Sequence, residues 1–207
     1  MTSGYRSGKA FHMILRFTLF LTLVFVTHQS FAGDIQAAFQ SLQNVGENWE
    51  PDGAVCEQLA RLKIRAAYPE NQYTITGDIE YDTGALTIGE LDVIVIEKSS
   101  NRVILVQEVK CWKNFAGGLE KAQSQKLRFL WHLGKTPQAM RFTSYDGTKL
   151  TAANFASSFP FVFVSQAGGV AKGFDEELDL NLSEIKQLRM QLLKCQDQGH
   201  CKKPDQE

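Results

Sequence analysis

The chain has 207 residues, with 22 Lys and Arg against 23 Asp and Glu, a formal net charge of −1. Three of the basic residues and none of the acidic ones lie in residues 1–32, so residues 33–207 carry 19 basic and 23 acidic side chains. This balance excludes a globally basic nucleic-acid binder, and any site for a polyanion must be a local patch. Residues 33–207 have the length of one ordinary domain.

Residues 1–32 have the pattern of a secretory signal peptide. An apolar run at 17–26 is followed by small residues at Ser30 and Ala32, the spacing that a signal peptidase cuts. The basic residues that precede this run are Arg6, Lys9 and Arg16. The apolar run is too short to span a bilayer comfortably, although an uncleaved N-terminal anchor remains the alternative. Because the leader is long, Met13 is an alternative start.

The first predicted elements are two helices and a strand. Residues 34–43 have apolar side chains at helical spacing, with Asp34 as the N-cap. Residues 54–67 repeat this spacing, and Pro69 follows them as a stop signal. The segment QYTITGDIEYD, residues 72–82, alternates and is rich in β-branched residues, so it predicts a strand.

Residues 89–97 and 102–110 predict a hairpin of two buried strands, apolar on both faces and therefore central in a sheet. A three-residue loop over 99–101 would place Asn101 in the left-handed position. That loop sets a register in which Asp92 lies opposite Glu108. The same register places Glu90 opposite Lys110.

The rest of the chain predicts a helix at 119–133 opened by a glycine pair, strands at 138–144 and 159–166, and a last helix at 183–195. The expected order is helix, three strands, helix, strand, helix. This order predicts an α/β fold with a mixed β-sheet flanked by helices, in a single domain over residues 33–207.

All four cysteines, Cys56, Cys111, Cys195 and Cys201, follow the predicted cleavage point. An even number in an exported chain indicates two disulfides. Of three possible pairings, proximity favours Cys195–Cys201 with Cys56–Cys111. The alternative is a metal site at Cys195, His200 and Cys201, which lacks a fourth ligand.

Charged residues flank the apolar core of the hairpin. Residues two apart in a strand point to the same face, so Glu108 projects with Lys110, and Glu90 with Asp92. Carboxylates that converge repel one another unless a cation neutralises them. Their hard oxygens suit Mg²⁺, which binds one or two carboxylates together with waters and substrate phosphates.

The pattern GELDVIV followed by VQEVK resembles the active-site signature of the PD-(D/E)XK nuclease superfamily, in particular the GEIDLI…VEVK pattern of its small endonuclease-like and resolvase-like members. The resemblance runs from about Ala54 to Leu133. It departs from the superfamily's name at Leu91, which stands where the name has proline. The resemblance implies a restriction-endonuclease-like core.

The resemblance also implies roles for the hairpin residues. Asp92 and Glu108 would hold a divalent ion, Mg²⁺ or Mn²⁺, with the Val109 carbonyl as a further ligand. Lys110 would position the attacking water or stabilise the charge of the pentacovalent phosphorane. The alternative is a set of cross-strand salt bridges at an exposed end of the sheet.

Family members often add a glutamate on the preceding helix and a glutamine on the following one. Glu57 fits the first role, although it also forms an i,i+4 pair with Arg61. Gln125 fits the second role and competes with Gln123 for it. Glu90 is expected to support the site rather than bind the ion.

Basic residues crowd the segment after the hairpin, and they could grip a phosphate backbone. They are Lys113, Lys121, Lys126, Arg128 and Lys135. A solvated helix face is the alternative.

Together these features predict an exported, Mg²⁺-dependent endonuclease that hydrolyses phosphodiester bonds of nucleic acid, with DNA favoured, in the periplasm or outside the cell. No stable membrane association is expected after signal cleavage. The alternative is a secreted, disulfide-stabilised binding module with an inactive nuclease fold.

Overall fold

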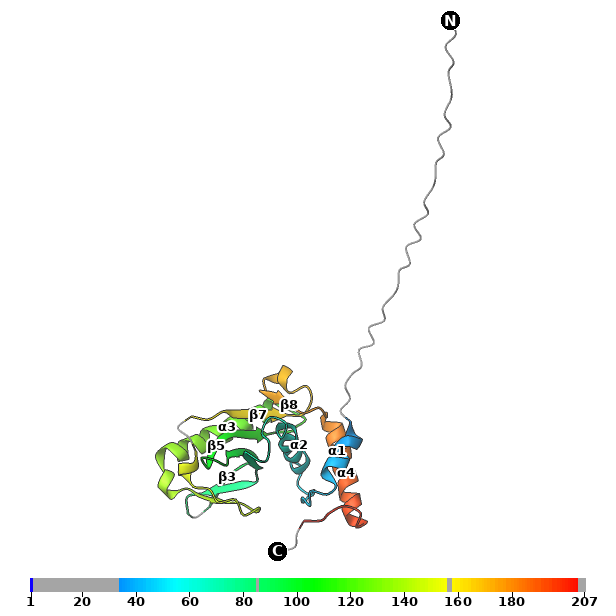
Figure 1. Ribbon diagram of the computed structural model, residues 1–207. Coiled ribbons are helices and arrows are strands. Elements are labelled where there is room, and N and C mark those ends of the chain that lie inside the picture. The colour runs from blue at the N-terminus through cyan, green and yellow to red at the C-terminus, as the bar shows by residue number, and fades with distance from the viewer. Residues whose placement is uncertain (2–33, 85, 156–157, 205–207) are drawn as a thin grey trace. The chain divides into compact units, whose positions relative to one another are not determined.

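The computed structural model describes residues 1, 34–84, 86–155 and 158–204 (Figure 1). The predicted signal peptide, residues 1–32, lies outside the described residues apart from Met1. No helix within the described residues combines the length and the apolar composition that crossing a membrane requires.

Four α-helices form where periodicity predicts them, with some changes at their ends. They are α1 (Ile35–Leu42), α2 (Ala54–Ile64), α3 (Phe115–Lys135) and α4 (Leu182–Asp197). The Asp34 side chain caps α1 by accepting a hydrogen bond from the backbone N–H of Ala37, as predicted. Helix α3 begins earlier than predicted because Asn114 caps it, so Gly117 and Gly118 lie inside the helix. Three short 3₁₀ helices are η1 (Pro137–Ala139), η2 (Ala152–Asn154) and η3 (Val170–Lys172).

The strands form two sheets. The larger has the order β1-β4-β5-β7-β8, and the smaller has the order β3-β2-β6. The strands of the larger sheet are β1 (Tyr73–Thr76), β4 (Val93–Glu97), β5 (Arg102–Val109), β7 (Phe161–Ser165) and β8 (Glu176–Glu177). Those of the smaller are β2 (Ile79–Asp82), β3 (Thr87–Leu91) and β6 (Arg141–Thr143). The larger sheet is mixed, since β5, β7 and β8 are parallel whereas β1, β4 and β5 are antiparallel.

Two predicted strands are each divided between the sheets. Residues 72–82 form β1 and β2, separated at Gly77-Asp78, where Asp78 has a left-handed φ of 52°. Residues 89–97 form β3 and β4, separated by a bend at Asp92. The predicted order of three strands between two helices is therefore wrong: five strands lie between α2 and α3, and three more follow α3. The predicted α/β class and mixed sheet are confirmed.

The predicted hairpin register is correct at its open end and wrong at its turn. Val93 pairs with Gln107, which continues to Asp92 opposite Glu108. A bulge between Val95 and Ile96 shifts the register by one residue, so Glu97 rather than Lys98 pairs with Arg102. Asn101 takes the predicted left-handed conformation, with a φ of 54°.

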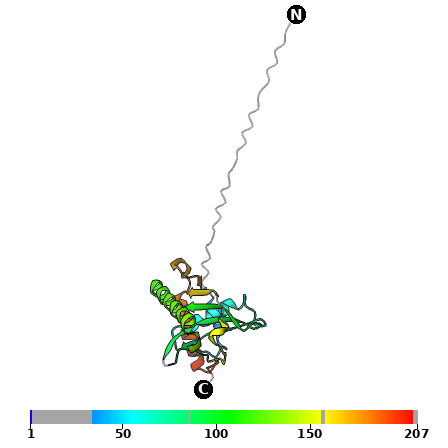
Figure 2. The same ribbon diagram turned by 90° about the vertical axis from the view of Figure 1, so that its left-hand side faces the viewer.

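Two apolar clusters pack on the sheets. One joins α1, α2 and α4 to residues of the larger sheet such as Val93, Val95 and Val109. The other joins Phe129 of α3 to Ile94 and Val106 and to the smaller sheet. In Figure 1, α2 lies between the sheet and the pair of α1 and α4, and Figure 2 shows α3 (green) along the opposite side. Strands β4 and β5 are thus central and covered on both faces, as predicted.

The structure contains both predicted disulfides. Cys56 at the start of α2 is bonded to Cys111 after β5, and Cys195 in α4 is bonded to Cys201. The alternative metal site at Cys195, His200 and Cys201 is wrong because both thiolates are consumed by the disulfide. Two disulfides in one domain are typical of an oxidising compartment.

The two disulfides should contribute unequally to stability. In the chain-entropy model a seven-residue loop, as in Cys195–Cys201, stabilises by roughly 2 kcal/mol, and a loop as long as that of Cys56–Cys111 by roughly 4 kcal/mol. Denaturant unfolding of the variants Cys195→Ala/Cys201→Ala and Cys56→Ala/Cys111→Ala measures both losses. Equal losses would contradict this ranking. Four alkylatable thiols in the unreduced, exported protein would contradict the disulfides themselves.

Candidate active site

Asp92 lies at the bend between β3 and β4, and residues at the end of β5 bind its carboxylate. It is 4% exposed. Its Oδ2 accepts hydrogen bonds from the backbone N–H of Val109 at 2.7 Å and from Nζ of Lys110 at 2.9 Å. The Asp92 side chain therefore bridges the ends of β4 and β5 and is fixed in position by both contacts.

Glu108 lies in β5 and Lys110 directly follows this strand. The two residues are two apart, so their side chains lie on the same face, where they meet Asp92. Glu108 is 0% exposed, and its Oε1 lies 2.6 Å from Nζ of Lys110. Its Oε2 has no hydrogen-bond partner within the described chain. Nζ of Lys110 also donates to the Val109 carbonyl at 3.0 Å. A fully buried carboxylate oxygen without a donor is costly unless another cation or a proton satisfies it.

The packed charges shift the pKa of several groups. Burial and then the charge of Asp92 raise the pKa of Glu108 to about 8, against the attraction of Lys110. Burial lowers the pKa of Lys110, but the charges of Asp92 and Glu108 outweigh it and leave that pKa above its usual value. Lys110 is therefore a cation at neutral pH, while the site favours retention of a proton on Glu108.

Two further glutamates belong to the same electrostatic cluster. Burial, followed by the charges of Asp92, Asp78 and Glu90, raises the pKa of Glu57 to about 9. Burial and the same neighbouring aspartates raise the pKa of Glu90 to about 7. Glu57 of α2 thus lies within electrostatic range of Asp92. Glu90 is not opposite Lys110, because β3 pairs with β2, where Glu90 faces Glu80.

Arg61 has a role that the sequence did not reveal. Its ion pairs are with Asp78 at 2.7 Å and Glu47 at 4.0 Å, rather than with Glu57 as the helical spacing suggested. Its Nη2 also donates to the backbone carbonyl of Asp92 at 3.2 Å. Gly77 lies beside this contact, and a Cβ there would overlap the Asp92 carbonyl. Arg61 therefore holds the bend that carries Asp92.

Of the two glutamines on α3, Gln125 is the more buried. Gln123 is exposed, whereas Gln125 is half-buried and its Oε1 is buried without a hydrogen-bond partner among the described residues. Arg128, about one turn further on, hydrogen-bonds Tyr81. Burial raises the pKa of Tyr81, Arg128 opposes this shift, and the charge of Glu108 adds to it. Tyr81 therefore lies within electrostatic range of Arg128 and Glu108, which the sequence did not indicate.

The predicted basic residues differ in how accessible they are. Lys113 and Lys121 are exposed. Lys126 donates to the Phe161 carbonyl at 3.5 Å and lies 5.5 and 5.2 Å from the ring centroids of Phe161 and Phe163. Lys126 is therefore engaged with β7 and is less available to a phosphate backbone than Lys113 and Lys121 are.

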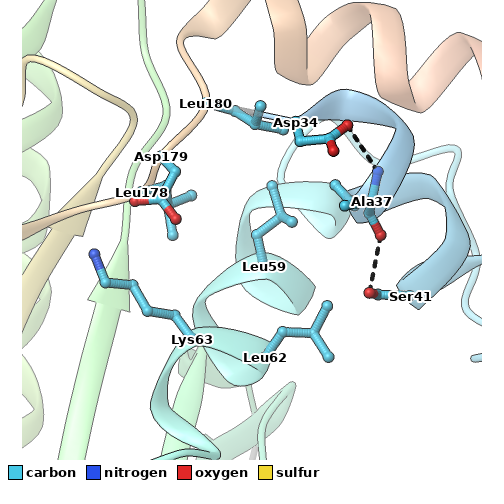
Figure 3. A pocket seen from close by; sticks show the side chains of 10 residues that line it. Asp34, Ala37, Ser41, Leu59, Leu62, Lys63, Leu178, Asp179 and Leu180 are labelled. Carbon is cyan, nitrogen blue, oxygen red and sulfur yellow. Dashed lines mark hydrogen bonds between the residues drawn. The ribbon is translucent and has the colours of Figure 1, made fainter. Parts of the chain in front are cut away.

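A cavity of about 440 Å³ lies between α1, α2 and residues 178–180 (Figure 3). It contains none of the clustered acidic residues. Three of its polar side chains have partners: Asp34 caps α1, Ser41 donates to the Ala37 carbonyl, and Lys63 donates to the Glu177 carbonyl. The fourth, Asp179, is exposed. Its remaining lining is largely Leu and Ala, so it offers no reactive group.

The acidic pair fits a small divalent ion. The described residues include no group of three or more His, Cys, Asp or Glu side chains arranged to hold a metal. Mg²⁺ needs fewer protein ligands than that, since it keeps several waters and binds one or two carboxylates. Asp92, Glu108 and the Val109 carbonyl would supply hard oxygens of this kind, and Oε2 of Glu108 has no hydrogen-bond partner among the described residues.

The raised pKa values of these glutamates predict how the stability of the metal-free protein depends on pH. The pKa values of Glu90, Glu108 and Glu57 rise from 4.5 to about 7, 8 and 9 on folding. Between these limits the folded chain holds protons that the unfolded chain has released, so stability should fall as pH rises from 5 to 9. The raised pKa of Lys110 adds no slope there, because its contribution disappears only at higher pH.

Thermal unfolding in EDTA measures this slope. One unit of pKa displacement corresponds to about 1.4 kcal/mol, or roughly 3–6 °C in melting temperature for a domain of this size. Glu57→Gln should flatten the slope, and Glu70→Gln, at a glutamate whose side chain is 80% exposed, should not. A melting temperature that is level or rises over this pH range would contradict the clustered charges.

Comparison with models of known protein families, with characterised proteins and with solved structures finds no match to this chain.

Proposed function

We propose that this protein is an exported, metal-dependent nuclease that hydrolyses phosphodiester bonds of DNA in the periplasm or outside the cell. The observation that carries the proposal is the meeting of Asp92, Glu108 and Lys110, with one oxygen of the fully buried Glu108 unpartnered in the described chain. We also propose that the chain has a restriction-endonuclease-like core, as the signature-like sequence around these residues suggests.

Asp92, Glu108 and the Val109 carbonyl would hold Mg²⁺ or Mn²⁺. Such an ion supplies Lewis-acid stabilisation of the phosphate charge and lowers the pKa of a bound water. Asp92 is already fixed by the Val109 N–H, so the ligand set is preorganised on the protein side.

Lys110 would act on the reacting phosphate. It keeps its proton at neutral pH, and Nζ now contacts Asp92, Glu108 and the Val109 carbonyl. It would exchange one of these contacts for a phosphate oxygen or the attacking water, where a fixed cation stabilises charge that develops in the transition state.

Glu57 and Gln125 would orient water and substrate beside this centre. Glu57, with a pKa of about 9, holds a proton at neutral pH in the absence of metal and can donate it in a hydrogen bond. Gln125 has a buried oxygen free to accept one. Lys113, Lys121, Lys126 and Arg128 remain the proposed phosphate-backbone contacts, of which Lys113 and Lys121 are the most accessible.

One observation favours a second candidate, a secreted binding module without catalysis. Nζ of Lys110 contacts both carboxylates directly, as in a structural salt bridge. Incubating the oxidised, mature protein with plasmid, single-stranded DNA and RNA in Mg²⁺, Mn²⁺ or EDTA separates the two. Divalent-dependent cleavage supports the nuclease. If every substrate stays intact under every condition, the nuclease is excluded and the binding module is the remaining candidate.

A further inference from the structure

A second cavity begins at the residue that follows Lys110. Its volume is about 310 Å³, and it lies between the segment after β5 and the first turns of α4. Its lining includes the indole of Trp112, one carboxylate (Asp52), and the apolar side chains of Leu182 and Ile185. Three cations also line it: Lys113, Lys186 and Arg189. This mixture suits a ligand that has both a planar ring and negative charge.

Trp112 is 45% exposed, and its backbone is held in place. Its backbone carbonyl accepts a hydrogen bond from Nε2 of Gln166 at 2.9 Å, and Oγ of Ser165 donates to the Lys110 carbonyl at 2.7 Å. A Cβ on Gly118 would lie 3.5 Å from that of Trp112 and 3.6 Å from that of Lys110, so these two side chains leave the backbone on the same side. Residues two apart in extended chain are separated by about 6–7 Å.

Two of the cations in this cavity are available to a ligand. Arg189 is engaged, since it donates to the carbonyls of Trp49 and Glu50 and pairs with Asp52 at 3.0 Å. Lys113 and Lys186 are exposed, and neither has an ion pair with any described residue. The cavity therefore has an unneutralised positive charge beside an exposed aromatic ring.

We propose that this cavity binds a nucleotide of a single nucleic-acid strand, next to the position at which the strand is cut. Its base stacks on Trp112, and its phosphate contacts Lys113 and Lys186. Stacking on an aromatic side chain combined with a basic groove is the general mode of single-strand binding, because a base is accessible to stacking once it has left a duplex. This inference rests on the proposed nuclease function and adds the form of its substrate.

The test is fluorescence anisotropy of a labelled 15-nucleotide oligothymidylate with the full mature protein in EDTA, where cleavage is prevented. Trp112→Ala should weaken binding by about 5- to 100-fold. An oligomer with abasic sites should bind wild type and Trp112→Ala equally. Lys113→Ala/Lys186→Ala should reduce the slope of log affinity against log salt by about 0.7 for each phosphate that the variant no longer neutralises.

Two controls match these changes in residue type. Trp131→Ala removes a tryptophan that is 55% exposed on α3, and Lys203→Ala removes an exposed lysine beyond the other end of α4. Both should bind like wild type. Circular dichroism and melting temperature verify that every variant is folded, and the lysine variant changes only exposed side chains.

Four results would overturn the inference. If wild type cuts nucleic acid but the cavity variants keep wild-type affinity, the site is elsewhere and the nuclease proposal stands. If a duplex depends on Trp112 as strongly as the single strand does, or if inorganic phosphate competes fully at millimolar concentration, the assignment of a stacked nucleotide is wrong. If wild type neither binds nor cuts any oligomer, the nuclease proposal fails as well.

Discussion

Replacing Lys110 by Met should lower the rate of phosphodiester cleavage by about 10²–10³-fold while divalent-ion binding survives. The change keeps the apolar stem and removes the ammonium that contacts Asp92 and Glu108. A single preorganised transition-state contact is typically worth about 3–4 kcal/mol, which sets the size of the decrease. The metal should bind at least as tightly, because the carboxylates no longer have a competing cation.

Asp92→Asn should affect metal binding as well as cleavage. It keeps the shape of the side chain but removes one negative charge from the proposed ligand set, so both metal affinity and cleavage should fall. Lys98→Met is the control for Lys110→Met, since Lys98 adjoins the turn end of the same hairpin. Calorimetry with Mn²⁺ and a plasmid-nicking assay give the two readouts. Unchanged cleavage in Lys110→Met would remove this lysine from the mechanism.

Gly77→Ala should destabilise the protein by about 5 kcal/mol or more, or prevent folding. The added methyl would overlap the backbone carbonyl of Asp92 and crowd the Arg61 guanidinium. Flexible side chains can move away from a clash, but the Asp92 backbone is held between β3 and β4. The melting temperature of the variant should therefore fall by more than about 10 °C, at about 2–4 °C per kcal/mol.

Gly134→Ala is the matched control for this change. Gly134 lies in α3, and a Cβ there would have no neighbour within 4 Å. Alanine at an unstrained helical position should stabilise by about 0.5–1 kcal/mol. If both variants melt like wild type, the close approach of Gly77 to Asp92 is wrong.

The helices and the acidic pair could be predicted because their signals are local. Asp34 caps α1 in the expected way, since an aspartate before an apolar periodic segment needs only its own turn to form that bond. The approach of Asp92 to Glu108 followed from strand alternation and a short hairpin loop. A bulge near the turn changed the register there and left the open end as predicted.

The division of the sheet could not be predicted in this way. The segment at 72–82 alternates through its break, and that at 89–97 runs into an apolar stretch, so the sequence pattern alone gives one strand where two form. The break depends on Gly77, Asp78 and Asp92, whose partners are distant in sequence. Gly77-Asp78 was the available signal, because a glycine inside a strand pattern often marks a close backbone approach.

The surroundings of the site were predicted only in part for the same reason. Glu57 and Gln125 lie on helices that follow recognisable patterns. Arg61 was assigned to the wrong partner, because helical spacing points to Glu57, whereas its actual partner Asp78 lies between β1 and β2. Tyr81 was not recognised at all. Its contact with Arg128 joins the smaller sheet to α3, and no local pattern specifies such a contact.

A calorimetric titration of the wild-type protein with Mn²⁺ tests most directly whether Asp92 and Glu108 are a metal site rather than a structural salt-bridge cluster. A metal site predicts saturable binding of the ion at pH 8, and a marked decrease of affinity in Asp92→Asn. Release of protons should accompany binding, because the metal-free site raises the pKa of Glu108 to about 8. A wild-type protein that takes up no Mn²⁺, or an Asp92→Asn variant that binds it equally well, would contradict a metal site at these residues.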